Sequence, residues 1–141
     1  MNELETMYND VIMDHYTLSP NKRDIKDCSH EKKGINPSCG DEITLKIKVI
    51  DGLIKDAAFI GTGCAISISS TSIMIDLIKD KTIKEALVII DEFRKMINKE
   101  KEDVDDLEEA GIFKNISNMP ARIKCATLCY NTLEKMLEEN K

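Results

Sequence analysis

Cys39 and Asp41 stand two residues apart in the stretch NPSCGDEITLKIKVIDG, just before an alternating apolar run. On an extended chain, residues i and i+2 point to the same face. The apolar positions 43, 45, 47 and 49 share the parity of this pair, so we expect both side chains at the rim of one buried strand face. A thiolate beside a carboxylate indicates either half of a metal site or a thiol with a charged neighbour.

Two further cysteines lie beside signals for helix starts. Cys64 follows two glycines in GTGCAIS, where a strand meets a helix start, and the free N–H groups of a helix start favour a thiolate. Cys125 falls near the start of the last predicted helix, one turn after Arg122, whose charge on the same face would stabilise a thiolate or an anionic metal site. The candidate ligands of a tetrahedral zinc site are therefore Cys39, Asp41, Cys64 and Cys125. Spacing alone leaves open that these cysteines are small core residues.

The composition indicates a single soluble domain over residues 1–141. A chain of 141 residues with 42% hydrophobic and 33% charged residues can bury a core without disulfides. Its longest apolar run, residues 86–90, is too short to cross a bilayer, and its polar, acidic start resembles no targeting segment, so we expect a cytoplasmic protein. In that reducing compartment, five cysteines favour metal or thiol chemistry over disulfides. The net charge of −6 argues against nucleic-acid binding.

The first half of the chain predicts a helix followed by a small sheet. Apolar positions at helical spacing predict a helix over residues 3–18, capped by Asn2. Residues 21–36 are polar and loop-like, with one short strand expected near residues 25–29. The alternation over residues 43–49 predicts a half-buried strand, Asp51-Gly52 a hairpin turn, and residues 53–60 the returning strand.

The second half predicts helices in series, which is not a βαβ pattern. The run after Cys64 becomes helical towards its end, and Thr82 with Glu85 forms a capping box that opens a helix through about Asn98. Residues 99–111 are strongly charged and predict a solvated helix or loop with little core contribution. Pro120 is placed for the first turn of a final helix. The fold class is therefore α+β, with a small antiparallel sheet of about three strands packed against several helices.

Four segments carry a resemblance to a known family. VIMDHY, NPSCGD, GTGCAIS and PARIKCATL resemble motifs of the U-type iron–sulfur cluster assembly proteins, the SufU, IscU and NifU N-terminal family. The likeness covers nearly the whole chain and is strongest for the SufU branch. IscU-type proteins have a histidine directly before the third cysteine, where this chain has Lys124. Residues 95–117 likewise resemble a SufU-type insertion.

This resemblance implies a function and a site. Proteins of the SufU type bind Zn²⁺ through residues matching Cys39, Asp41, Cys64 and Cys125, and accept sulfane sulfur from a cysteine desulfurase of the SufS type. The last cysteine takes the persulfide after a residue of the partner displaces it from zinc, and Arg122 would assist that exchange. The expected activity is thus sulfurtransferase-like, supplying a downstream cluster scaffold or apo-proteins.

Two other functions remain open from the sequence. The same four residues could hold a transient [2Fe–2S] cluster on a scaffold that assembles it and passes it to apo-proteins. A purely structural zinc module would instead unfold when a chelator removes the metal, which the long amphipathic helices argue against.

Three other residues of reactive type are assigned no catalytic role. Cys129, one turn after Cys125, is explained better as a packed small residue than as a sulfur relay. Cys28 lies outside the family motifs and is interpreted as incidental, though oxidation-prone where exposed. His15, a lone histidine near the apolar stripe of the first helix, is expected to be hydrogen-bonded or to face a partner rather than to bind a metal.

Overall fold

A three-stranded antiparallel sheet forms one side of the molecule in this computed structural model, which describes residues 9–103 and 105–139. The strands β1 (His30–Asn36), β2 (Asp41–Ile50) and β3 (Leu53–Thr62) pair in that order. The alternation predicted for β2 is confirmed, because Ile43, Leu45 and Ile47 are buried. The predicted turn is also present, with positive φ angles at Asp51 and Gly52 that suit a tight hairpin.

The first strand lies later in the chain than the sequence predicts. The strand expected near residues 25–29 is absent there, and β1 occupies residues 30–36 instead, with His30 opposite Ile47 and Asn36 opposite Asp41. An edge strand pairs with only one neighbouring strand and is largely exposed to solvent, so a charged sequence such as HEKKGIN can form it. Lys32 of this strand forms an ion pair with Glu139 of the C-terminal helix, and Lys33 forms one with Glu42 of β2.

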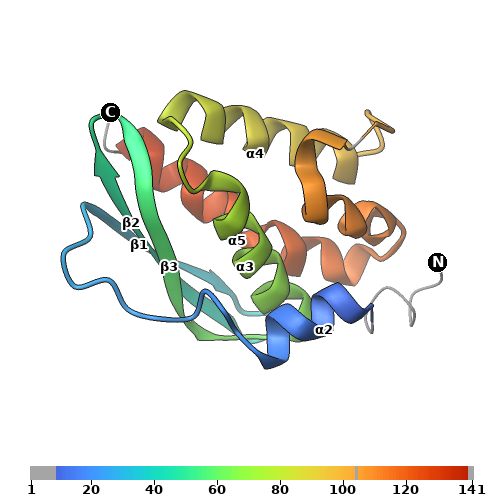
Figure 1. The fold of residues 1–141 in the computed structure, drawn as a ribbon. Helices are drawn as coiled ribbons and strands as arrows, with labels where there is room; N and C mark the ends of the chain where they lie inside the picture. The colour runs from blue at the N-terminus through green and yellow to red at the C-terminus, as the bar shows by residue number, and fades with distance from the viewer. Residues whose placement is uncertain (1–8, 104, 140–141) are drawn as a thin grey trace.

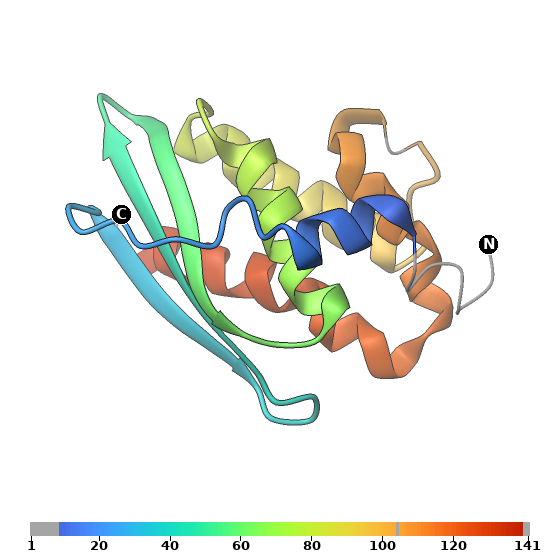
Figure 2. The same cartoon turned by 60° about the horizontal axis from the view of Figure 1, so that its bottom comes forward.

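The helices pack against one face of this sheet (Figure 1). They are α2 (Asp10–Thr17), α3 (Ala65–Ile78), α4 (Ile83–Ile97), the 3-10 segment η1 (Asp105–Asn118) and α5 (Pro120–Glu139). α3 and α5 lie against the sheet, α4 and η1 lie on their far side, and α2 crosses α3 (Figure 2). α3 is therefore buried along nearly its whole length.

The start of α4 follows the predicted capping chemistry, and the start of α2 does not. Thr82 and Glu85 form the expected capping box, with both hydrogen bonds at 3.1 Å. The helix predicted over residues 3–18 differs from the structure, because Asn9 has a non-helical backbone with ψ of 139° and the helix starts after it; the predicted cap Asn2 lies outside the described residues. Within them α2 begins at Asp10, and the side chain of Asn9 accepts a hydrogen bond from the Val11 N–H at 2.9 Å.

The charged segment contributes more to the core than its sequence predicts. Leu107 and Ala110 are buried at 1% and 0% exposure, although residues 99–111 were expected to be solvated. The expectation is wrong because η1 buries these two apolar side chains while its carboxylates stay outside. A positive φ of 49° at Glu108 breaks the helical geometry between them. No helix in the described part of the chain is both long and apolar enough to span a membrane.

Candidate metal centre

Cys39 lies in the tight connection between β1 and β2, and not on the strand itself. β2 begins only at Asp41, because the N–H of Cys39 donates to the Asn36 carbonyl at 3.3 Å and closes a turn. Gly40 takes a φ of +70°, a backbone conformation that side chains with a Cβ rarely adopt. Cys39 and Asp41 nevertheless reach the same side, so the predicted proximity holds through a turn and not through strand parity.

Asp41 is a completely buried carboxylate held by two N–H donors. Its Oδ1 accepts the backbone N–H of Cys64 at 3.0 Å, and its Oδ2 accepts the side-chain N–H of Asn36 at 3.1 Å. Among the described residues no lysine, arginine or histidine forms an ion pair with Asp41. A buried negative charge without a cationic partner is costly, so this position favours a bound cation.

Cys64 is the N-cap residue of α3, as the sequence predicts. Its Sγ accepts the backbone N–H of Ser67 at 3.4 Å, so the positive end of the helix faces the sulfur. Gly63 brings the two chain segments together, because a Cβ there would lie 2.8 Å from Asp41 Oδ1. Any larger residue at position 63 would occupy the space that the carboxylate uses.

Cys125 lies in the second turn of α5 and is fully buried. Its Sγ is 3.1 Å from Cys39 Sγ and 3.7 Å from the side-chain nitrogen of Asn36. Asn36 therefore contacts two of the candidate ligands, and sequence analysis did not single it out. The signal available was its place immediately before Pro37 in the NPSCGD motif, but asparagine is so common beside turns that its type alone carries little information.

The structure brings three of the four predicted ligands into one group. The ligand atoms of Cys39, Asp41 and Cys125 all lie within 4.8 Å of one another. Cys64 is outside that group of mutual distances, but its backbone N–H bonds directly to Asp41 and its thiol interacts with that of Cys125. Cys64 thus lies at the edge of the group.

Electrostatics couple Arg122 to the three thiols. Burial raises the pKa of the Cys125 thiol, and the neighbouring Cys39 and Cys64 raise it further. For Arg122, burial lowers the pKa of the guanidinium, but the attraction of Cys64, Cys125 and Cys39 outweighs this, so the net direction is upward. A cation therefore lies where the sequence predicts one, one helical turn before Cys125.

The donor set fits a Zn²⁺ ion. Thiolates and one carboxylate are ligands that zinc takes in four-coordinate sites, with Zn–S bonds of about 2.3 Å. Two such bonds at a tetrahedral angle place their sulfurs about 3.8 Å apart, so the Cys39–Cys125 pair needs to open by about 0.7 Å from its 3.1 Å. The buried Asp41 carboxylate, which has no ion-pair partner among the described residues, fits a cation beside the two thiols.

The remaining cysteines lie outside this group. Cys129 is fully buried, with its sulfur 3.6 Å from Ser70 Oγ, and burial raises the pKa of its thiol to about 12. A thiol with that pKa is protonated at neutral pH, which agrees with the predicted packing role. Cys28 is partly exposed in the loop before β1.

Comparison with known proteins places the chain in a family. The family model for the NifU-like N-terminal domain matches residues 7–126. A Bacillus subtilis protein named zinc-dependent sulfurtransferase SufU is 43% identical over 94% of this chain and 90% of its own length. A Thermotoga maritima protein named iron–sulfur cluster assembly scaffold protein IscU is 38% identical, with 94% of each chain covered.

Solved structures agree with this assignment. A crystal structure from Fervidobacterium islandicum, described as an iron–sulfur cluster assembly scaffold protein for the SUF system, superposes with a TM-score of 0.89 at 36% identity, covering 94% of this chain and 98% of that one. A NifU-like N-terminal protein from Brucella abortus, 18% identical, shares the fold with a TM-score of 0.83 and covers 99% of this chain and 100% of that one. The chain therefore belongs to the NifU-like N-terminal domain family, whose relatives here include proteins named SufU and IscU.

Proposed function

We propose that this protein serves iron–sulfur cluster biogenesis in the cytoplasm as a zinc-dependent sulfur-transfer protein. In this proposal Cys39, Asp41, Cys64 and Cys125 hold Zn²⁺, and Cys125 accepts persulfide sulfur from a cysteine desulfurase of the SufS type. The observation that carries the proposal is the buried Asp41 carboxylate beside the Cys39–Cys125 pair. The similar B. subtilis protein named zinc-dependent sulfurtransferase supports it.

The transfer step needs no external oxidant or reductant. The thiolate of Cys125 attacks the terminal sulfur of the partner's cysteine persulfide, forming a new S–S bond while the partner's own S–S bond breaks. The partner's cysteine leaves as a thiolate, and Cys125 then carries the persulfide for a downstream scaffold or apo-protein. Arg122 lies one turn from Cys125 and stabilises the negative charge on the sulfur in both states.

Two features of this site suit such an exchange. Bound Zn²⁺ would hold its thiol ligands deprotonated at neutral pH, which offsets the raised pKa that burial gives Cys125. Asp41 would be the one hard oxygen ligand among soft sulfurs, and it already shares its oxygens with the N–H groups of Asn36 and Cys64. A fourth thiolate would bind zinc more firmly, so the carboxylate keeps the site labile.

The proposal is tested by labelling the persulfide formed from a desulfurase and cysteine. The wild-type chain should acquire one sulfane sulfur, found by mass spectrometry on the peptide containing Cys125. Cys125→Ala should lose this label, whereas Cys28→Ala, which removes a cysteine outside the ligand group, should keep it. A folded Cys125→Ala protein that still takes up sulfur from the desulfurase at the wild-type rate would exclude Cys125 as the acceptor.

A scaffold function is the second candidate, because the T. maritima and F. islandicum proteins are named as scaffolds. In that case the same residues would hold a [2Fe–2S] cluster. Metal analysis of protein purified with and without oxygen separates the two. Near-stoichiometric zinc without visible absorption supports sulfur transfer, whereas a brown anaerobic sample with equal iron and acid-labile sulfide supports the scaffold.

A further inference from the structure

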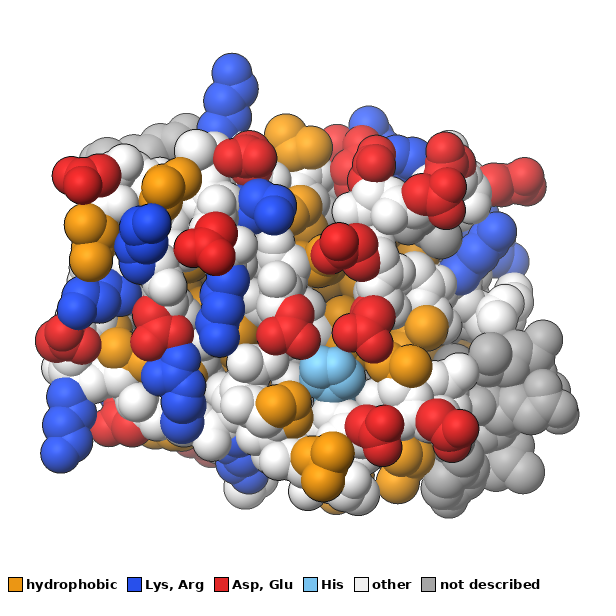
Figure 3. All heavy atoms as spheres, viewed as in Figure 1, with side chains coloured by type: hydrophobic (Ala, Val, Ile, Leu, Met, Phe, Trp, Pro, Cys, Tyr) orange, Lys and Arg blue, Asp and Glu red, His pale blue; other side chains and the backbone are white. Residues whose placement is uncertain are grey.

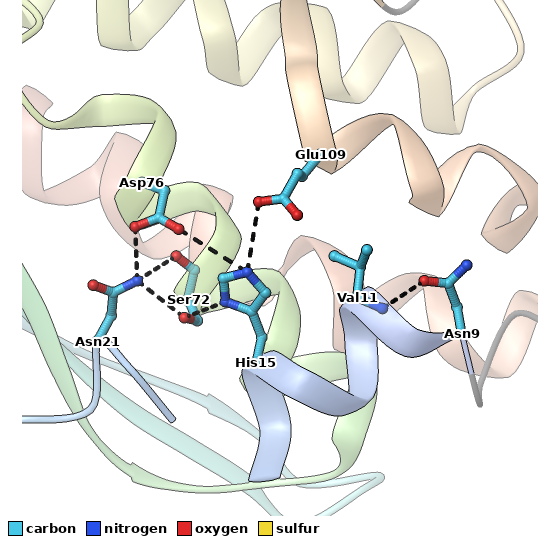
Figure 4. A network of polar contacts seen from close by, with 7 residues as sticks. All are labelled: Asn9, Val11, His15, Asn21, Ser72, Asp76 and Glu109. Carbon is cyan, nitrogen blue, oxygen red and sulfur yellow. Dashed lines mark hydrogen bonds and ion pairs between the residues drawn. The ribbon is translucent and has the colours of Figure 1, made fainter. Parts of the chain in front are cut away.

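A second group of potential metal ligands lies where α2, α3 and η1 meet (Figure 4). His15, in the last turn of α2, has only 8% of its surface exposed. Its Nε2 faces Asp76 Oδ2 at 4.0 Å and Glu109 Oε1 at 3.7 Å, and both of these carboxylates are about half exposed. Among the described residues no hydrogen bond to Nε2 is formed, because both distances exceed hydrogen-bonding range.

Neighbouring polar groups fix the orientation of this ring. His15 Nδ1 lies 2.7 Å from Ser72 Oγ, and Ser72 is one turn before Asp76 on α3. The amide of Asn21 donates to Ser72 Oγ at 3.0 Å and to Asp76 Oδ1 at 3.0 Å, so it holds the hydroxyl and the carboxylate together. The prediction that His15 is hydrogen-bonded is confirmed, and the bond uses only one of its two nitrogens.

The other nitrogen is therefore directed at negative charge. When Nδ1 donates its proton to Ser72 Oγ, the lone pair of Nε2 points toward Asp76 and Glu109. A lone pair facing two carboxylates is repulsive unless a proton or a cation lies between them. In a metal-binding histidine, the ring nitrogen that does not bind the metal usually donates its N–H to a neighbouring group, and this hydrogen bond sets the tautomer.

We propose that His15 Nε2, Asp76 and Glu109 bind a divalent transition-metal cation at a site separate from the thiol group. One neutral imidazole and two carboxylates balance the charge of a divalent ion, and this set of one nitrogen and two oxygens suits Fe²⁺, Mn²⁺ or Zn²⁺. Acidic side chains surround a histidine on this face, whereas lysines and arginines gather over the sheet (Figure 3). The net charge of −6 adds to the attraction of a cation.

The geometry needs only a small closure. Donors about 2.1 Å from one ion lie about 3.0–3.4 Å apart at angles between right and tetrahedral. The separations of 3.7 and 4.0 Å must therefore shorten by about 0.3–1.0 Å, through movement of the two half-exposed carboxylates, of which Asp76 is held at its Oδ1 by Asn21. Open positions on the solvent side would hold water or exchangeable ligands.

The second site is well separated from the thiol site along the same helix. Cys64 caps the start of α3, and Asp76 lies twelve residues later near its end. At 1.5 Å of rise per residue, the two lie about 18 Å apart along the helix axis. The two sites can thus be filled independently, and the second one carries no thiol, so it favours harder ions than the first.

Mn²⁺ is the probe for the test, because it prefers oxygen and nitrogen ligands to sulfur and its free-ion EPR signal disappears on binding. Full-length protein is first given one equivalent of Zn²⁺ and then titrated with Mn²⁺. We expect one saturable Mn²⁺ per chain, with affinity at least about tenfold weaker in Glu109→Gln and Asp76→Asn. Asp14→Asn, on the exposed face of α2, is the matched control for the loss of one carboxylate and should bind as the wild type does.

A second readout identifies the ligand directly. Bound Mn²⁺ should broaden the ring resonances of His15 in NMR spectra much more strongly than those of His30, which lies on β1 and outside the proposed site. The proposal is overturned if Mn²⁺ shows no saturable binding, if Asp14→Asn weakens binding as much as Glu109→Gln does, or if both histidines broaden equally. None of these outcomes depends on whether the thiol group transfers sulfur.

Discussion

Replacing Gly63 with alanine tests how the chain positions Asp41. The new Cβ would lie 2.8 Å from Asp41 Oδ1, and 3.2 and 3.3 Å from Oγ and Cβ of Ser67. Contacts below 3.0 Å do not persist, so one side must move. The contacts with Ser67 stay above 3.0 Å, so the carboxylate is the group that is displaced.

The cost follows from the hydrogen bond that this displacement breaks. Asp41 Oδ1 accepts the Cys64 N–H at 3.0 Å, and a buried hydrogen bond to a charged group contributes about 1.5–3 kcal/mol. We therefore expect Gly63→Ala to lower the free energy of unfolding of the metal-free protein by about 2 kcal/mol. Zinc affinity should also fall, by at least about tenfold, because a ligand is moved from its place.

Gly52→Ala is the matched control. Gly52 has a φ of +78° in the β2–β3 turn, with no atom within 4 Å of its Cβ position, so alanine there adds backbone strain of about 1 kcal/mol without filling space. Urea unfolding of metal-free protein and zinc competition with a chromophoric chelator measure the two effects separately. If Gly63→Ala lost no more stability than Gly52→Ala and bound zinc like the wild type, the proposed support of Asp41 by Gly63 would be refuted.

Three further predictions concern stability. Tyr130→Phe should raise the free energy of unfolding by about 1 kcal/mol in urea denaturation, because among the described residues the buried Tyr130 hydroxyl has no hydrogen-bond partner. Leu107→Ala should lower it by about 2–5 kcal/mol, and a loss below 0.5 kcal/mol would mean that the 3-10 segment does not belong to the core. The hydrogen bond and charge of Arg94 lower the pKa of Glu134. Their pairing therefore stabilises the fold fully above the usual glutamate pKa, and this stabilisation is lost as the pH falls through the lowered pKa. Glu134→Gln should thus cost about 1 kcal/mol at neutral pH and remove this part of the acid sensitivity, as measured by unfolding at several pH values.

Local signals in the sequence predicted those parts of the fold that depend only on residues close to one another along the chain. The turn at Asp51 and the capping box at Thr82 are decided by residues within four positions, and both are confirmed. β1 was misplaced because it is defined by pairing with β2, so its charged sequence carries little strand signal. Leu107 was missed for a similar reason, since burial in a charged segment depends on the helices packed around it.

The residues of the two candidate sites also divide into those that local sequence signals predict and those that depend on contacts between distant parts of the chain. Cys39, Asp41 and Cys64 could be singled out from glycines, spacing and a helix start, and the structure places them in contact through one turn and one cap. The partners of His15 could not, because Ser72 is 57 positions away and a buried serine has no distinctive sequence signal. α3 itself contains many serines and β-branched residues, yet it is helical from end to end because its burial outweighs their modest intrinsic preference.

The burial of Cys125 sets a condition on any transfer of sulfur to it. The sulfur has no exposed surface, and Cys39, which is partly exposed in the turn before β2, lies against it at 3.1 Å. A persulfide on a partner cannot approach within bonding distance of a sulfur enclosed in this way. Acceptance at Cys125 therefore requires the turn over residues 37–40 to move away from α5. Loss of the Cys39–Cys125 contact would be part of that opening. The hydrogen bonds of Asp41 to Asn36 and Cys64 are made by residues outside this turn, so they can hold the remainder of the site while the turn moves.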